Sequence, residues 1–168
     1  MSNSRQFIQR RSGFTIVEML LYMGILTLFF TVLTQISLSI LNVQLESEST
    51  REVEDDSRAV YTRLAYDVSQ ADAIVTPSNV GENSTTLTLS VAGVPHIYAV
   101  VNGNLIARVG DQTYMVNSVG TSITDFTALR LGNTQGKHAV TIHYKLTSAT
   151  KQSGGPEMRE SQVTLGIR

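Results

Sequence analysis

The chain has 168 residues, which is enough for one modest domain together with an extended element. It contains no cysteine, so a disulfide framework and thiolate chemistry are excluded. Its 13 basic and 14 acidic residues give a net charge of -1, and this balance argues against a basic surface that coats nucleic acid.

Residues 1–13 form a basic leader that carries Arg5, Arg10 and Arg11 and no acidic residue. An ordinary secretory signal is cleaved after its apolar region, but here the small residue Gly13 precedes the apolar run. Cleavage at Gly13 would remove three of the 13 basic residues, so ten basic and 14 acidic residues would remain. Arginines on the cytoplasmic side agree with the positive-inside rule, and we expect the bulk of the chain to lie outside the cytoplasm.

Residues 14–45 are uncharged except for Glu18 and contain no proline. A helix of this length can cross about 30 Å of hydrocarbon. A carboxylate at mid-bilayer depth costs roughly 2.5 kcal/mol or more, so Glu18 is predicted to be functional and to meet a cation. Gly24, Thr27 and Thr31 follow steps of three and four, a spacing of small residues that favours close helix packing. The alternative is that these residues are merely tolerated in a membrane helix.

Residues 46–75 continue the helical pattern with one apolar face. This face is expected to cover a sheet, and it consists of Val53, Val60, Leu64, Val68 and Ala71. Charged residues populate the rest of the helix, and the run Glu54-Asp55-Asp56 is interpreted as solvated. The helix is predicted to end at Thr76-Pro77, because a residue that precedes proline avoids helical angles.

The N-terminal residues resemble those of the type IV pilin family, which includes the pseudopilins of type II secretion and the competence pilins. The resemblance is carried by Gly13-Phe14-Thr15, by Glu18 and by the apolar run between a basic leader and the domain. It implies that a prepilin peptidase cleaves after Gly13 and that the amine of Phe14 is then methylated. It also implies that Glu18 neutralises the terminal amine of a neighbouring subunit during assembly.

Residues 76–168 have the period-two pattern of antiparallel strands. The expected strands centre on residues 87–91, 97–101, 105–109, 114–116, 126–131, 140–146 and 163–167, and Asn102-Gly103-Asn104 is a hairpin signal. With the long N-terminal helix laid on the sheet, the predicted fold class is α+β. Residues 63–71 (RLAYDVSQA) are also similar to the helix end of J-type minor pseudopilins and W-type minor pilins.

The resemblance implies a structural subunit of a type IV pilus or a type II secretion-like filament. Its expected partners are other pilin or pseudopilin subunits, the prepilin peptidase, an inner-membrane assembly platform and, before assembly, membrane lipid. The expected location is the cytoplasmic membrane, with the C-terminal domain outside the cytoplasm, and an extracellular or periplasmic filament after assembly. No nucleic acid or cofactor is predicted.

Catalytic and metal-binding patterns are weak in this chain. His96, His138 and His143 do not have the spacing of metal ligands, and no nucleophile elbow is present, so the chain is not expected to be an enzyme. Asn102, Asn104 and Asp111 offer oxygen atoms but lack a recognisable order of calcium ligands.

Two alternatives to the filament subunit remain. The exposed domain could be a tip binding module, either an adhesin or a DNA-uptake pilin. The chain could also be a plain single-pass anchored protein, which needs no cleavage at Gly13.

Overall fold

The computed structural model describes residue 13 and residues 15–133, 136–150 and 154–167. The chain divides into two compact units, Met1–Leu41 and Asn42–Arg168. Helix α1 (Ile16–Gln70) contributes residues to both units.

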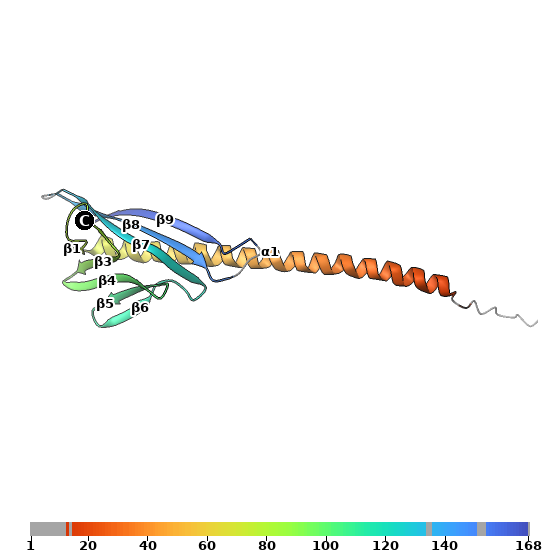
Figure 1. Ribbon diagram of the computed structural model, residues 1–168. Helices are drawn as coiled ribbons and strands as arrows, with labels where there is room; N and C mark the ends of the chain where they lie inside the picture. The colour runs from red at the N-terminus through yellow and green to blue at the C-terminus, as the bar shows by residue number, and fades with distance from the viewer. Residues whose placement is uncertain (1–12, 14, 134–135, 151–153, 168) are drawn as a thin grey trace, which may run out of the picture. The chain divides into compact units, whose positions relative to one another are not determined.

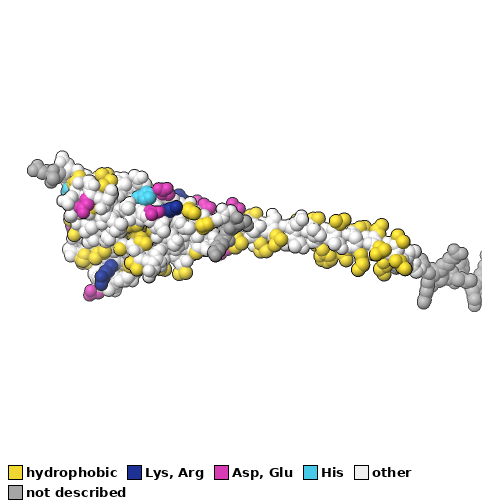
Figure 2. All heavy atoms as spheres, viewed as in Figure 1, with side chains coloured by type: hydrophobic (Ala, Val, Ile, Leu, Met, Phe, Trp, Pro, Cys, Tyr) yellow, Lys and Arg dark blue, Asp and Glu magenta, His cyan; other side chains and the backbone are white. Residues whose placement is uncertain are grey.

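In the first unit, α1 begins with a side-chain cap. Thr15 Oγ1 accepts a hydrogen bond from the Glu18 backbone N–H at 3.2 Å, which satisfies one of the free donors of the first turn. The helix then presents apolar side chains on its exposed surface (Figure 2). None of the most apolar part of this segment is buried. In the described part of the chain, α1 is the one helix long and apolar enough to span a membrane.

Four hydroxyl groups of this apolar segment are satisfied within the helix itself. They donate to carbonyl oxygens four residues earlier, from Thr27 to Met23, Thr31 to Thr27, Thr34 to Phe30 and Ser37 to Leu33. This bonding removes the cost of placing an unpaired hydroxyl in hydrocarbon. Their small side chains thus remain available for packing.

The second unit contains two antiparallel sheets beside the C-terminal part of α1 (Figure 1). The five-stranded sheet has the order β1-β3-β4-β5-β6, with β1 (Ala73–Thr76), β3 (Thr86–Val91), β4 (Val94–Val101), β5 (Asn104–Val109) and β6 (Gln112–Met115). The four-stranded sheet has the order β2-β7-β8-β9, with β2 (Asn83–Ser84), β7 (Thr121–Gly132), β8 (His138–Ser148) and β9 (Met158–Gly166).

The predicted apolar face of α1 forms part of the core. Val53, Val60, Leu64, Val68 and Ala71 are all buried. The inward-facing residues of β3, β4, β5, β7 and β8 complete the cluster, among them Leu87, Leu89, Tyr98, Leu105, Ile123, Ile142, Tyr144 and Leu146. The predicted α+β class is confirmed.

The predicted hairpin is confirmed between β4 and β5. Asn102 and Gly103 have positive φ values of 51° and 78°, and Val101 pairs with Asn104 across them. Two central residues with positive φ match the twist of the flanking strands, and asparagine followed by glycine adopts this conformation at low cost.

Two predictions about the fold are wrong, one on the end of the helix and one on the number of sheets. The helix ends at Gln70, before Thr76-Pro77, because Asp72 N donates to Ser90 O at 2.8 Å and the chain continues as strand β1 beside β3. The strands form two sheets where one was expected. The chain passes from the first sheet to the second between β6 and β7. Asn117 lies in this segment, and its side-chain oxygen accepts a hydrogen bond from Leu105 N at 2.8 Å.

Candidate assembly residues and buried carboxylates

Glu18 lies in the first turn of α1 and is partly exposed. Its carboxylate accepts a hydrogen bond from the Tyr22 hydroxyl at 3.1 Å, one turn further along the helix. An acidic residue in this position also interacts favourably with the N-terminal end of the helix dipole. Glu18 therefore has local partners within one chain, and its pairing with a neighbouring amine stays a prediction.

The predicted processing site is described in part. Gly13 is exposed, and a Cβ atom built on it meets no other atom within 4 Å. Phe14, the predicted methylation site, lies outside the described residues.

The predicted packing residues are on the surface of the first unit. Gly24, Thr27 and Thr31 are all exposed, and a Cβ atom at Gly24 has no neighbour within 4 Å. The arrangement leaves these residues accessible to another helix, but their role in packing stays a prediction.

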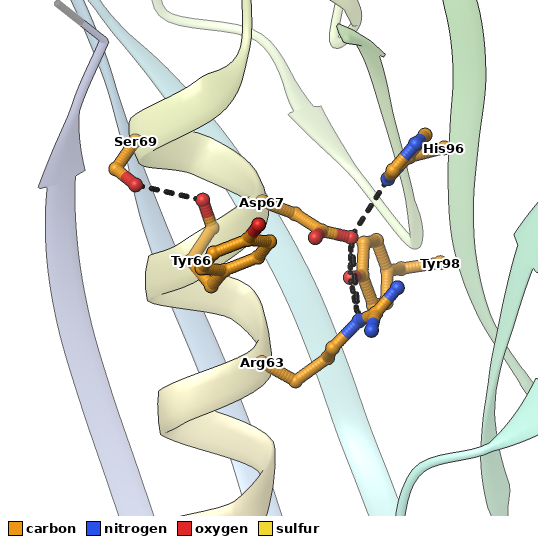
Figure 3. Close-up of polar contacts among 6 residues, drawn as sticks. All are labelled: Arg63, Tyr66, Asp67, Ser69, His96 and Tyr98. Atoms are coloured by element: carbon orange, nitrogen blue, oxygen red, sulfur yellow. Dashed lines mark hydrogen bonds and ion pairs between the residues drawn. The ribbon is translucent and has the colours of Figure 1, made fainter.

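Two carboxylates of α1 that were not predicted to be buried lie in the interior of the second unit, and Asp67 is the first. Its side chain is 1% exposed and points from the last turns of α1 toward β4 (Figure 3). Oδ2 accepts from the Tyr98 hydroxyl, lies 2.8 Å from His96 Nδ1 and lies 3.4 Å from Arg63 Nε. This three-part contact ties the end of the helix to the five-stranded sheet.

The pKa values of the partners follow from this geometry. Burial, followed by the hydrogen bond to Asp67, raises the pKa of the Tyr98 hydroxyl above its ordinary value, so Tyr98 remains a donor. The hydrogen bond between Arg63 and Tyr98 raises the pKa of the Arg63 guanidinium, and the charge of Asp67 adds to the effect. The cluster therefore holds one cation and a neutral phenol against a buried oxygen.

Asp56 is the second buried carboxylate, with 8% of the residue exposed. Its Oδ2 accepts from Ser118 N at 2.9 Å, from Ser118 Oγ at 2.8 Å and from the Thr121 hydroxyl. The interpretation of the run Glu54-Asp55-Asp56 as solvated is therefore wrong for Asp56. Its carboxylate thus has three donors in place of water, two from Ser118 between β6 and β7 and one from Thr121 at the start of β7.

Glu52, one turn earlier on the same helix, holds a second segment. Its carboxylate accepts from Ser148 Oγ at 3.4 Å and from Thr150 Oγ1 at 3.3 Å. It also packs closely against Gly120, where an added Cβ atom would come within 2.8 Å of the carboxylate. Glu52 and Asp56 together fasten two connecting segments to the helix.

His96 and His143 have different carboxylate partners. His96 contacts Asp67, whereas His143 lies 2.6 Å from Glu160 on the neighbouring strand. This contact raises the pKa of His143 above its ordinary value. Among the described residues, no group of three or more histidine, aspartate or glutamate side chains has a geometry that could hold a metal ion. Of the residues considered as calcium ligands, Asn104 accepts a hydrogen bond through Oδ1 from Asn117 Nδ2 at 3.3 Å.

We expect Asp56→Ala to lower the free energy of unfolding of residues 42–168 by roughly 3 kcal/mol, because three donors lose a charged acceptor. Asp55→Ala is the matched control, since Asp55 is the exposed neighbour of Asp56 on α1. Urea unfolding of the two variants measures the difference. Equal stability would show that water replaces the carboxylate at no cost.

Comparison of the chain with models of protein families, with curated proteins and with solved structures finds no match. The architecture itself is consistent with a pilin-like fold. It has an N-terminal helix with an exposed apolar segment, and the later turns of this helix pack on antiparallel sheets.

Proposed function

We propose that the chain is a structural subunit of a type IV pilus or type II secretion-like filament. In this proposal a prepilin peptidase processes the chain after Gly13, and the subunit assembles through its N-terminal helix. The observation that carries the proposal is the apolar segment of α1, which is exposed in the isolated chain. Such a surface needs lipid or other apolar helices around it.

The details of Glu18 and of the preceding residues favour a filament subunit over a plain anchored protein. Glu18 lies in the first turn of a helix that starts directly after the Gly13-Phe14-Thr15 segment. In a low-dielectric environment its carboxylate attracts a freed terminal amine strongly. Residues 42–168 then face outward as the variable domain. The similarity of residues 63–71 to J-type and W-type subunits supports a minor subunit.

Processing tests this proposal directly. We expect the mature chain to begin at a methylated Phe14, and Gly13→Val to abolish cleavage because a β-branched side chain crowds a site that takes a very small residue. Gly24→Val is the matched control: a Cβ atom at Gly24 meets nothing within 4 Å, and Gly24 lies beyond the cleavage site. Intact-mass measurement of the membrane-extracted protein distinguishes the two variants.

A wild-type chain that keeps residues 1–13 in cells with an active prepilin peptidase would contradict the proposal and favour the plain anchored protein. A processed chain that is absent from sheared filaments would instead favour a membrane-retained role for the mature protein.

A further inference from the structure

Strand β9 is an edge strand of the four-stranded sheet and, among the described residues, pairs only with β8 (Figure 1). It has nine residues, whereas the edge strands β1, β2 and β6 have four, two and four. Proteins ordinarily protect a long edge strand with proline, lysine or a β-bulge. Residues 158–166 contain no proline or lysine, and their pairing with β8 has no register shift. The outer edge of β9 is therefore long and unprotected.

The register of β8 and β9 shows which backbone groups point outward. Ile167 N donates to His138 O at 3.0 Å, and residues 148 and 157 are bonded in the same way at the other end of the strand. In an antiparallel ladder, hydrogen-bonded pairs alternate with pairs whose backbone groups point away from each other. The odd-numbered residues of β9 therefore bond to β8, and the N–H and C=O groups of Glu160, Gln162 and Thr164 point to the free edge.

A hollow of about 280 Å³ lies between β9 and α1. It is lined by Arg159 of β9 and by Glu54, Ser57, Arg58 and Tyr61, which share one side of α1 because they are spaced by three, four and seven residues. Among the described residues, none of β8 lines the hollow, so it opens on the side of the free edge.

The hollow contains one cation without a counter-charge. Arg159 Nη1 lies 3.6 Å from Glu54 Oε1, so these two charges balance each other. Within the part of the chain that the structure describes, Arg58 takes part in no ion pair. A guanidinium group binds a carboxylate through charge-assisted hydrogen bonds, so a carboxylate is the complementary group for this hollow.

The residues of β9 that face α1 define what an added strand would present there. Side chains alternate between the two faces of a sheet, and Ser161, Val163 and Leu165 are the half-buried set of β9. Ser161 Oγ lies 3.4 Å from Ser57 Oγ, so this set faces α1 and Ser161 adjoins the hollow. In an added strand, the side chain opposite Ser161 would therefore face the hollow.

We propose that the free edge of β9 binds an extended segment of another protein as an added antiparallel strand. The segment bonds to the backbone of Glu160, Gln162 and Thr164, and its residue opposite Ser161 places a carboxylate beside Arg58. In strand addition, the main-chain bonds give affinity and the side-chain pocket gives specificity. The inference goes beyond the proposed filament and does not depend on it.

A second copy of β9 does not complement this site. If two antiparallel β9 strands bonded through their outward backbone groups, the side facing α1 would receive Arg159, Ser161, Val163 or Leu165 of the other copy. None of these side chains carries a carboxylate, and Arg159 would add a cation beside Arg58. The occupant is therefore a different segment, one that carries an acidic side chain.

Amide hydrogen exchange of the full-length chain in detergent micelles, resolved to single residues, tests whether the edge is free. We expect the amides of Gln162 and Thr164 to exchange about a hundredfold faster than those of Val163 and Leu165, which bond to β8. Equal protection of all four would show that the edge is already covered and would overturn the proposal. Protection of Gln162 and Thr164 that rises with chain concentration would assign the edge to a second copy, which also overturns it.

Binding is tested with the capped heptapeptide Thr-Val-Thr-Val-Thr-Glu-Thr, whose glutamate lies opposite Ser161 when its threonines face solvent. We expect it to protect the amides of Gln162 and Thr164 and to bind at least about tenfold more tightly than the same peptide with lysine in place of glutamate. Arg58→Glu should reverse this preference, whereas the control Arg108→Glu, exposed on β5 of the other sheet, should not. No protection at millimolar peptide, or equal binding of the two peptides, contradicts the proposal.

Proline substitution tests the backbone bonds. Gln162→Pro removes an outward N–H and keeps the bonds to β8, because proline is tolerated where the N–H of an edge strand faces solvent. We expect peptide binding to weaken at least about tenfold, since main-chain bonds carry the affinity. Thr113→Pro is the matched control, because Thr113 lies on the edge strand β6 and its N–H also points outward.

Circular dichroism checks that both proline variants are folded. Unchanged binding by folded Gln162→Pro would place the peptide elsewhere and overturn the proposal. If Gln162→Pro does not fold, the reversal of preference in Arg58→Glu decides the question, and its absence overturns the proposal. None of these measurements needs a filament, so their failure is distinct from failure of the proposed function.

Discussion

Asp67→Ala is expected to be among the most destabilising single substitutions in residues 42–168, with a loss of roughly 3–5 kcal/mol, the range for breaking a buried ion pair. The carboxylate is 1% exposed and has three partners, so its removal leaves a buried phenol and an imidazole without an acceptor. Arg63 is 40% exposed and can turn to water, so most of the loss arises at Tyr98 and His96.

Conservative variants separate charge from hydrogen bonding at this site. Asp67→Asn keeps an oxygen that can accept from Tyr98 but loses the charge that faces Arg63, so its loss should be smaller. Tyr98→Phe removes the hydroxyl donor and leaves the ring in the core. Asp72→Ala is the control, because Asp72 is an exposed aspartate just beyond the helix end.

The measurement is urea unfolding of residues 42–168, which form a compact unit with their own core. A domain of this size has a stability of about 5–15 kcal/mol, so the expected loss is a large part of the total. A stability for Asp67→Ala equal to that of Asp72→Ala would mean that the three contacts contribute nothing net.

The features predicted correctly from the sequence are those marked by a regular spacing of residues or by a local turn signal. Val53, Val60, Leu64 and Val68 recur with helical spacing, and each is buried against the sheets. Alternation predicted the inward-facing residues of β8, and Asn102-Gly103 predicted the turn between β4 and β5, because these signals arise from local geometry.

Features that depend on a single distant partner left no such signal. Asp56 and Asp67 look like ordinary charged residues of a helix surface, and only the fold brings Ser118 and Tyr98 to them. One hint was present, since both aspartates fall on the same side of the helix as the apolar face. A carboxylate within an apolar stripe should be expected to find buried donors.

The segment after the helix illustrates a second limit. Residues 73–76 fit either a last helical turn or a short strand. Their pairing with β3 is a tertiary contact, which overrides the local pattern.

Glu18→Ala is expected to leave insertion and cleavage intact and to reduce the fraction of the chain in filaments to about a tenth or less, since an unpaired buried charge costs several kcal/mol. The apolar segment and Gly13 are unchanged in this variant. The amine of the neighbouring Phe14 would then enter apolar surroundings without a counter-charge. Glu18→Gln keeps the shape of the side chain but not its charge, so it should lose most of the same interaction.

The structure adds a control that separates this account from a purely local role. The Glu18 carboxylate accepts from the Tyr22 hydroxyl within the same helix, so Tyr22→Phe removes a contact of the carboxylate and keeps its charge. If pairing with an amine is the function of Glu18, Tyr22→Phe should assemble at near the wild-type level. If the local bond in the first turn is what matters, Tyr22→Phe and Glu18→Ala should be equally impaired.

Incorporation is measured as the ratio of subunit in sheared filaments to subunit in the membrane, with processing checked by mass in each variant. Wild-type ratios for both Glu18 variants would rule out the charge pair, because both variants lack the carboxylate charge. A defect in Glu18→Ala that Glu18→Gln does not share would show that the carboxamide suffices, and the interaction would then be a neutral hydrogen bond. The expected pattern is a defect in both Glu18 variants with Tyr22→Phe unaffected, because only the charge of Glu18 offsets the cost of a buried ammonium group.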